Sequence, residues 1–239
     1  MALNIKRMGR APKRHIPIAL VIDCSCSMND IRPILNRATQ SLLTNLKNNV
    51  ELRQQVKLLT IHYNDTIRVV SDFTSAMDME DSALDIAQGA GTTDTGLALL
   101  TALERLDEMQ SICLGKKEVC SKPLVFLLTD GYPDAGTGAP DDYVQEVRSN
   151  YKEAAAAIRE REANDSLYFC AVGIQRQNGI GANMDMLKQL SEKPDRIFRM
   201  DDASIQNEGV ERFCQMIYDT AKAMSNNTPL QDALYHMLG

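Results

Sequence analysis

A carboxylate ends the first strongly apolar segment of this chain. The run IPIALVI, residues 16–22, is followed directly by Asp23 within the sequence VIDCSCSMND. Two hydroxyl side chains, Ser25 and Ser27, come next at alternate positions. Burying a carboxylate costs free energy unless a cation or hydrogen-bond donors pair with it. The spacing therefore raises the question of which group pairs with Asp23.

Two later segments carry oxygen-bearing side chains of the same kind. GAGTTDTG holds three threonines and an aspartate at residues 92–95, ahead of a predicted helix. LLTDG places Thr129 and Asp130 at the end of another apolar run. In an open parallel sheet, ligands bind beyond the carboxyl ends of the strands. We therefore expect the three segments to meet at one edge of a sheet.

The side chains of these segments are hard oxygen ligands. Carboxylates and hydroxyls suit Mg²⁺, Mn²⁺ or Ca²⁺ better than zinc. The carboxylates are too few to enclose Ca²⁺, whereas Mg²⁺ keeps several waters and often takes one or two carboxylates. The composition of the three segments therefore predicts a site for Mg²⁺ or Mn²⁺, with Ca²⁺ less favoured.

Strands and helices alternate along the rest of the chain. Apolar and β-branched runs predict strands at residues 16–22, 56–63, 67–70, 122–130, 166–174 and 196–200, and apolar residues at helical spacing predict helices at 31–46, 95–109, 143–163, 184–190 and 203–224. The short turn at residues 64–66 predicts a hairpin, so one edge strand is expected to be antiparallel. The fold class is α/β: a Rossmann-like, doubly wound, mostly parallel sheet with one antiparallel edge strand and helices on both faces.

The length and charge limit the domain organisation and the partners. The chain has 239 residues and a net charge of −6, which suits one large domain and argues against a broad basic surface for nucleic acid. We expect a basic arm at 1–15, the domain at 16–225, and a tail at 226–239 that forms a short helix. Neither a secretory signal nor a run of ~20 apolar residues is recognisable, so a cytoplasmic protein without a membrane partner is expected.

The six cysteines are expected to be reduced thiols. Cys113 and Cys120 have the wrong separation for a compact zinc knuckle, and no histidine lies near them in the sequence. With Cys170 and Cys214, they are predicted to be buried core residues. Cys24 and Cys26 flank Ser25; they are either small residues that fit or a redox-sensitive rim of the metal site.

The three motifs together resemble the von Willebrand factor A domain family with its metal-ion-dependent adhesion site. That family has D-x-S-x-S, a threonine in a glycine-threonine loop, and an aspartate in a TDG-type turn. The resemblance implies that the metal ligands here are Asp23, Ser25, Ser27, Thr93 and Asp130. The family usually has a small residue, often glycine, where Cys26 stands, and glycine permits backbone angles that cysteine does not.

A closer resemblance concerns the segments KPLVFLLTDGYPD, AVGI and MDMLKQLSEKPDRIFRMDD. They are similar to the bacterial tellurite-resistance and stress-response branch of the family (TerY-like). The resemblance implies a non-enzymatic module that binds a protein partner, whose Asp or Glu completes the metal coordination. The partner would be a kinase, a phosphatase or a Ter-type protein.

Two other interpretations of Asp23 and its neighbours are open. In the first, Ser25, Ser27 and the following Asn29 only cap the next helix. In the second, the protein is a metal-dependent phosphohydrolase with Asp23 as its nucleophile. Such enzymes usually have a second acid two residues later, where this chain has Ser25.

Overall fold

The fold was analysed in a computed structural model. It describes residues 12–86, 91, 93–131, 135–136, 138–175, 181–201, 203, 205 and 208–228. Most of the predicted basic arm and of the predicted C-terminal tail lies outside these residues. No helix within the described ranges has the length and apolar character needed to cross a bilayer.

A mostly parallel sheet forms the centre of the described structure. Its strands are β1 (Arg14–Asp23), β2 (Val56–Tyr63), β3 (Ile67–Ser75), β4 (Val119–Cys120), β5 (Leu124–Thr129), β6 (Tyr168–Gln175) and β7 (Ile197–Asp201). The strand order is β3-β2-β1-β5-β6-β7, and β4 pairs with the start of β1. Only the β2–β3 pair is antiparallel among the described strand pairs. The predicted fold class and the predicted antiparallel edge strand are confirmed.

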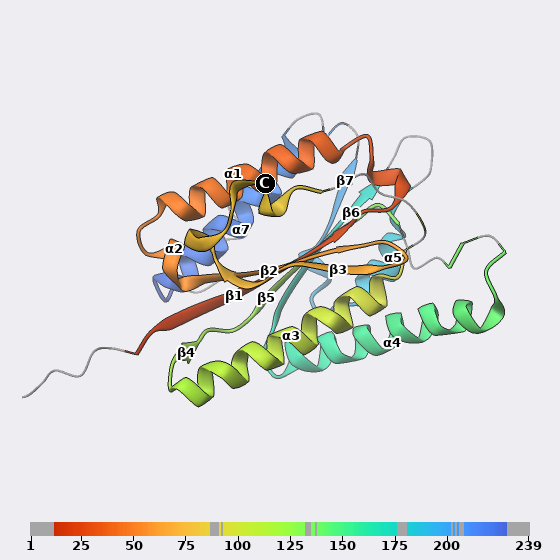
Figure 1. The fold of residues 1–239 in the computed structure, drawn as a ribbon. Helices are drawn as coiled ribbons and strands as arrows, with labels where there is room; N and C mark the ends of the chain where they lie inside the picture. Colours follow the sequence, from red (N-terminus) through yellow and green to blue (C-terminus); the bar gives the residue numbers. More distant parts are fainter. Residues whose placement is uncertain are drawn as a thin grey trace, which may run out of the picture.

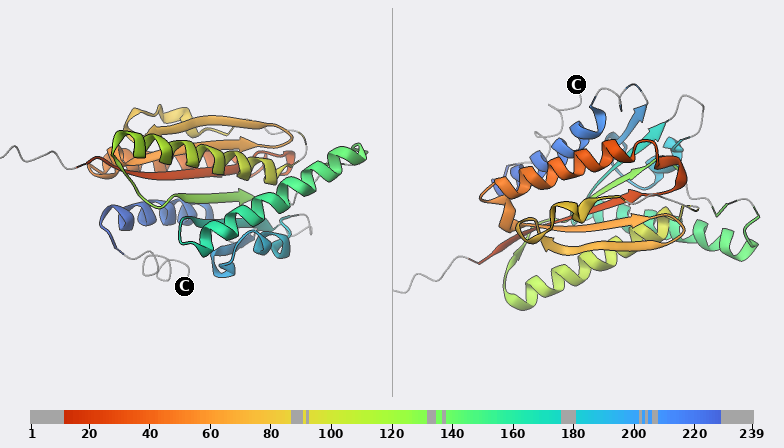
Figure 2. Two further views of the ribbon diagram at one scale, coloured as in Figure 1. Left: turned by 90° about the horizontal axis from the view of Figure 1, so that it is seen from below. Right: turned by 45° about the horizontal axis from the view of Figure 1, so that its top comes forward.

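Helices cover both faces of the sheet (Figures 1 and 2). One face carries α1 (Arg32–Asn48) and α7 (Gly209–Ser225), and the other carries α3 (Thr95–Lys116) and α4 (Asp141–Ala163). The shorter elements are α2 (Leu52–Gln55), α5 (Met184–Gln189), and the 3-10 turns η1 (Cys26–Met28), η2 (Ala76–Asp78), η3 (Asp81–Leu84) and η4 (Pro194–Arg196).

Strand β1 is buried on both faces, which explains its continuous apolar run. Successive side chains of a strand point to opposite faces of the sheet, so β1 contributes to two separate hydrophobic cores. The core shared with α1 and α7 contains Ile16, Ile18, Leu20 and Ile22. The core shared with α3 and α4 contains Ala19 and Val21.

Several boundaries differ from the predictions. The final long helix begins at Gly209 rather than at residue 203, and α3 continues to Lys116, seven residues beyond its predicted end at Met109. The extension of α3 keeps Cys113 on the buried side of the helix. Strand β1 begins at Arg14, inside the predicted arm, because β4 pairs with its first residues. Two short elements were not predicted: the two-residue strand β4 and the helix α2.

The cysteine predictions are confirmed in part. Cys113, Cys170 and Cys214 are buried, but Cys120 is only partly buried. The expectation that no histidine lies near Cys113 and Cys120 is wrong in three dimensions, since β4 places Cys120 beside His15 of β1.

Candidate metal centre

The strand order reverses between β1 and β5. The chain passes from β1 outward to β2 on one side, and the later strands β5, β6 and β7 extend on the other. Ile22 and Leu128 form the last pair of the β1–β5 ladder, so the next residues of both strands emerge at the same edge. This edge is the place where open α/β sheets bind ligands.

Asp23 is held rigidly at this edge. Its side chain is fully buried. The Ser25 backbone N–H donates to Asp23 Oδ1 at 2.8 Å, and the Thr129 hydroxyl donates to Asp23 Oδ2 at 2.6 Å. Burial raises the pKa of Asp23 above its ordinary value, against the opposing effect of these hydrogen bonds. The folded chain therefore holds the Asp23 carboxylate in one orientation, although its burial costs free energy.

A chain of hydrogen bonds joins the first motif to the third. The hydroxyl oxygens of Ser25 and Ser27 lie 3.1 Å apart, and Ser27 donates to Asp130 Oδ1 at 2.8 Å. Asp130 is only 2% exposed, although it lies outside a strand. The carboxylates of Asp23 and Asp130 and the hydroxyls of Ser25 and Ser27 are therefore linked by a series of hydrogen bonds.

Thr93 brings the second motif to the same place. It is buried, and a Cβ placed on Gly131 would lie 3.5 Å from Thr93 Oγ1 and 3.6 Å from Asp23 Oδ2. A glycine at this position therefore keeps the space between Thr93 and Asp23 open. The structure brings all five predicted site residues together.

Asp94 has a structural role beside the site. Its side chain caps α3 by accepting from Leu97 N at 2.9 Å, and it also accepts from Asn150 Nδ2 at 3.0 Å. Its backbone N–H donates to Asn64 O at 3.0 Å. These bonds hold the start of α3 in place and orient the loop that carries Thr93.

The von Willebrand factor type A domain family profile matches residues 18–212. The chain belongs to this family. Members of the family typically mediate metal-dependent protein interactions, and the three motifs identified in the sequence occupy the edge described above. The comparison with curated proteins returned no match.

Solved structures show the same fold. The von Willebrand factor type A protein from Catenulispora acidiphila is 16% identical with a TM-score of 0.54, over 86% of this chain and 43% of that chain. The pilus adhesin SpaC from Lactobacillus rhamnosus GG, in its open conformation, is 16% identical with a TM-score of 0.62, over 90% and 31%. Proximal thread matrix protein 1 from the mussel byssus, with a zinc-occupied MIDAS motif, is 15% identical with a TM-score of 0.53, over 87% and 48%. The present chain thus matches less than half the length of each of these proteins.

The residues of this von Willebrand factor A domain fit a bound divalent cation. The converging side chains offer carboxylate and hydroxyl oxygens, and two of the carboxylates are almost fully buried. A buried carboxylate is stabilised by an adjacent cation. The assignment of individual metal ligands stays a prediction, and the chemistry of the donor set agrees with it.

The structure contradicts the interpretation of the first motif as a helix cap. Ile31 is the N-cap of α1, and it makes no side-chain capping bond. Ser25 precedes η1 and also makes no side-chain capping bond. The Ser27 hydroxyl instead donates across to Asp130. The side chains of the two serines therefore do not cap η1 or α1.

One supporting residue was missed by the site prediction. Thr129 lies in the TDG-type turn, and its hydroxyl holds Asp23 from the neighbouring strand. The sequence signal was present, because Thr129 directly precedes Asp130. Its partner could be identified only from the pairing of β1 with β5.

The two cysteines of the first motif differ in exposure. Cys24 is buried, and burial raises its thiol pKa to about 12. Cys26 is exposed and is not among the described non-glycine residues with positive φ, so the position does not require glycine. The departure from the usual family residue is therefore compatible with the local backbone. A redox role for Cys26 stays a prediction.

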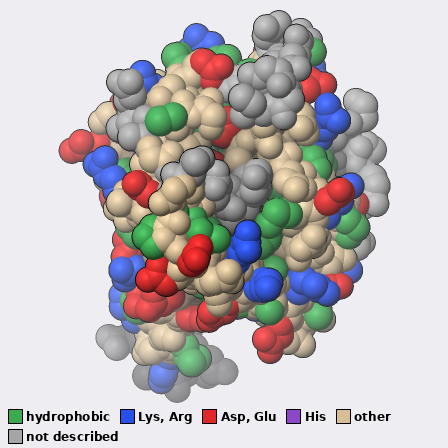
Figure 3. All heavy atoms as spheres, turned by 90° about the vertical axis from the view of Figure 1, so that its right-hand side faces the viewer, with side chains coloured by type: hydrophobic (Ala, Val, Ile, Leu, Met, Phe, Trp, Pro, Cys, Tyr) green, Lys and Arg blue, Asp and Glu red, His purple; other side chains and the backbone are tan. Residues whose placement is uncertain are grey.

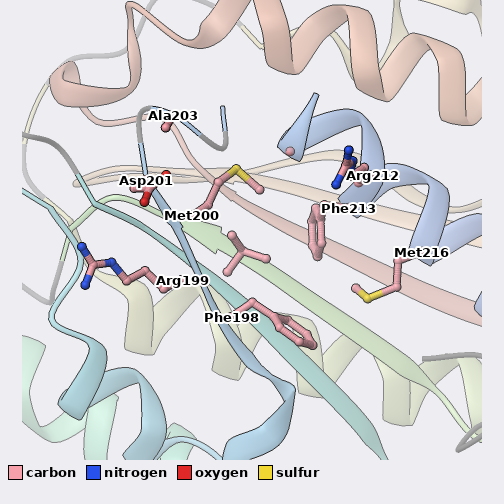
Figure 4. Close-up of a pocket in the computed structure, with 10 residues that line it drawn as sticks. Phe198, Arg199, Met200, Asp201, Ala203, Arg212, Phe213 and Met216 are labelled. Atoms are coloured by element: carbon pink, nitrogen blue, oxygen red, sulfur yellow. The ribbon is translucent and has the colours of Figure 1, made fainter. Parts of the chain in front are cut away.

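Figure 3 views the molecule from the edge of the candidate metal centre. Acidic and basic side chains both occur on the described part of this face. A separate cavity of about 660 Å³ lies between β7 and α7, lined by Phe198, Met200, Phe213 and Met216 among others (Figure 4). None of the five candidate metal ligands lines it. The cavity is thus distinct from the candidate metal centre.

Proposed function

We propose that this chain is a metal-dependent protein-interaction module. It binds Mg²⁺ or Mn²⁺, and an acidic side chain of a partner protein completes the coordination of the metal. The observation that carries the proposal is the convergence of two buried carboxylates and three hydroxyls at the β1–β5 edge. Those residues are Asp23, Ser25, Ser27, Thr93 and Asp130. The family membership supports this interpretation, because its domains typically mediate metal-dependent interactions.

The charge balance of the site permits an acidic partner. Ser25, Ser27 and Thr93 contribute oxygen atoms without negative charge, so Asp23 and Asp130 only balance a divalent cation and leave no excess negative charge to repel a carboxylate. A bound cation supplies a hard Lewis acid that accepts a carboxylate oxygen from outside the chain. The Thr129 hydroxyl and the Ser25 N–H keep Asp23 oriented while the partner binds.

The phosphohydrolase interpretation is less well supported. Asp23 is fully buried, and both of its carboxylate oxygens accept hydrogen bonds. These constraints suit a residue that holds a metal ion better than one that attacks a phosphorus atom. Turnover of a generic phosphate ester with Mg²⁺, abolished by Asp23→Asn, would restore the enzymatic interpretation.

The biological context is proposed from sequence resemblance alone. We propose a cytoplasmic protein of a bacterial stress-response or tellurite-resistance system, with a kinase, a phosphatase or a Ter-type protein as partner. The motifs of the TerY-like branch support this proposal. Identification of the proteins that bind to the native chain tests it.

Metal binding is tested first by thermal unfolding. Mg²⁺ or Mn²⁺ should raise the Tm, because a ligand that prefers the native state stabilises it; at about ten times Kd the free energy of unfolding rises by about 1.4 kcal/mol. Thr93→Ala should lose most of this rise. Thr220→Ala is the matched control, since Thr220 is a buried threonine on α7 whose hydroxyl bonds within its own helix. An equal rise in both variants would exclude Thr93 from the site.

Partner capture is tested by affinity purification from the native cell. Wild type and Thr220→Ala should recover the same proteins, EDTA should release them, and Mg²⁺ should restore them. Thr93→Ala should recover at least about tenfold less, since weaker metal binding lowers the fraction of competent sites. Recovery that is independent of both EDTA and Thr93 would move the interaction to another surface.

A further inference from the structure

A second cluster of side chains that can bind metals lies at the amino end of β1, at the other end of the sheet from Asp23. Ligand atoms of His15, Cys113 and Glu118 all lie within 4.8 Å of one another. His15 is the second residue of β1, and Asp23 is the last. At about 3.3 Å per residue, the two sites are about 26 Å apart along this strand.

The end of α3 brings Cys113 and Glu118 together. Lys117 takes a left-handed conformation with φ of 57°. Its N–H bonds Leu114 O at 3.1 Å, and the N–H of Glu118 bonds Cys113 O at 2.9 Å. These two hydrogen bonds form the Schellman motif, which closes the last turn of the helix and reverses the chain. Glu118 is therefore folded back beside Cys113.

The pairing of β4 with β1 then adds His15 and Cys120. Val119 N donates to Lys13 O at 2.8 Å, and Ser121 N donates to His15 O at 2.8 Å. His15 and Cys120 are direct neighbours in this parallel ladder. Figure 1 shows β4 next to the end of α3, so one helix end and two strands enclose the cluster.

The His15 ring is poised for a ligand. Its Nε2 lies 2.8 Å from Glu118 Oε2. Its Nδ1 is buried and has no hydrogen-bond partner within the described part of the chain. The residue is only 9% exposed. A histidine can bind a metal ion through either ring nitrogen, and here one nitrogen lies beside the Glu118 carboxylate and the other has no described partner.

We propose that His15, Cys113, Glu118 and Cys120 form a second metal site, for zinc or another thiophilic divalent ion. Thiolate and imidazole ligands select such ions, whereas the oxygen-lined centre suits Mg²⁺. Bond lengths of 2.0–2.3 Å separate neighbouring ligands of tetrahedral zinc by about 3.3–3.8 Å. The ligand atoms of His15, Cys113 and Glu118 lie within 4.8 Å of one another, and Cys120 joins this group as the neighbour of His15 in the β4–β1 ladder. Binding releases the thiol protons to solvent.

The test uses the full chain, reduced and freed of metal, and Co²⁺ as the probe. Only sulfur ligands give an intense thiolate-to-cobalt charge-transfer absorption, so oxygen-bound Co²⁺ at the other centre does not contribute. We expect this absorption to saturate at one equivalent of Co²⁺ and to disappear when zinc is added. His15→Gln should weaken Co²⁺ binding by at least about tenfold.

Matched variants assign the absorption to the cluster. It should disappear in Cys113→Ala and remain unchanged in Cys170→Ala, which removes a buried thiol on β6. Thr93→Ala should also leave it unchanged, so failure of the oxygen-lined centre and failure of this site are distinguishable. If Cys113→Ala does not fold, Cys120→Ala decides the outcome, because Cys120 is only partly buried.

Three results would overturn the proposal. The first is Co²⁺ binding to the wild type without thiolate absorption. The second is equal absorption in the wild type and in a folded Cys113→Ala or Cys120→Ala variant. The third is a Cys113–Cys120 disulfide in protein isolated and alkylated without air, detected by mass spectrometry, because a disulfide has no thiolate to offer.

Discussion

Helix α3 has different chemistry at its two ends. Before its first turn, Thr93 and Asp94 belong to the oxygen-rich edge of the sheet, and in its last turn Cys113 belongs to a cluster of sulfur and nitrogen atoms. The first end is held by hydrogen bonds to Asn64 and Asn150, and the second by the Schellman motif. Under the two proposals, the same helix positions one ligand for a hard cation and one for a soft cation. The metal preference then follows from the ligand type at each end of the strands and not from the fold.

The packing of α3 also differs between its ends, and this gives the largest expected effect. A Cβ on Gly96 would lie 2.2 Å from Tyr151 N of α4, whereas a Cβ on Gly115 would meet nothing within 4 Å. We expect Gly96→Ala to lower the free energy of unfolding by at least about 3 kcal/mol through overpacking. Gly115→Ala should raise it by about 0.5–1 kcal/mol because alanine favours helix.

Urea unfolding of the two variants measures both changes. Gly96→Ala should also weaken Mn²⁺ binding, since the displaced helix start carries the Thr93 loop. A Gly96→Ala protein as stable as Gly115→Ala would show that the α3–α4 contact is not tight. The packing of α3 against α4 would then not explain the position of the Thr93 loop.

The two described histidines make a second contrast. His15 bonds Glu118, whereas His62 on β2 is buried and its Nε2 has no described hydrogen-bond partner. Burial, with a smaller contribution from the charge of Arg68, lowers the pKa of His62 to about 4. The unfolded chain, with a pKa near ~6.5, therefore binds more protons between these values.

It follows that the contribution of His62 to stability should fall as the pH falls. The contribution of His62 is fully present above about pH 6.5 and is lost towards pH 4, for a total of about 3 kcal/mol. Urea unfolding at several pH values measures the slope. His62→Gln should reduce the slope of the free energy of unfolding against pH by an amount that corresponds to at most one bound proton. An equal slope in wild type and variant would show that other groups control the response to acid.

The third prediction concerns the support of Asp23. Thr129→Val removes the hydroxyl that donates to Asp23 Oδ2 and nearly preserves the side-chain shape. Loss of such an outer partner typically weakens metal binding about 10–100-fold. Thr60→Val is the control, because Thr60 is a buried threonine on the next strand whose hydroxyl has no described hydrogen-bond partner.

Calorimetric titration with Mn²⁺ compares the two variants. Thr60→Val should bind as the wild type does, and removing an unsatisfied buried hydroxyl should leave it at least as stable. Equal Mn²⁺ affinity in Thr129→Val and Thr60→Val would show that the Asp23–Thr129 bond does not tune the site.

Much of the fold was predictable because long buried strands leave a strong pattern. The apolar runs predicted β1 and β5, and the turn before Ile67 predicted the antiparallel β3. Boundaries were less predictable where tertiary packing decided them. Helix α3 continues past Met109 to Lys116 and buries Cys113, and no local pattern in the sequence indicates this burial.

The oxygen-rich site was predictable from the sequence, because its residues directly follow buried strands. A strand that is buried on both faces delivers its next residue to the end of the sheet, and the pairing of β1 with β5 then brings Asp23 and Asp130 together. The cluster of His15, Cys113 and Cys120, in contrast, is recognisable from the folded structure alone. Their proximity depends on the two-residue strand β4 and on the left-handed backbone conformation of Lys117. Neither feature is predictable from a sequence pattern. Long-range pairing of short elements is set by the packing of the whole chain, and local sequence does not record it.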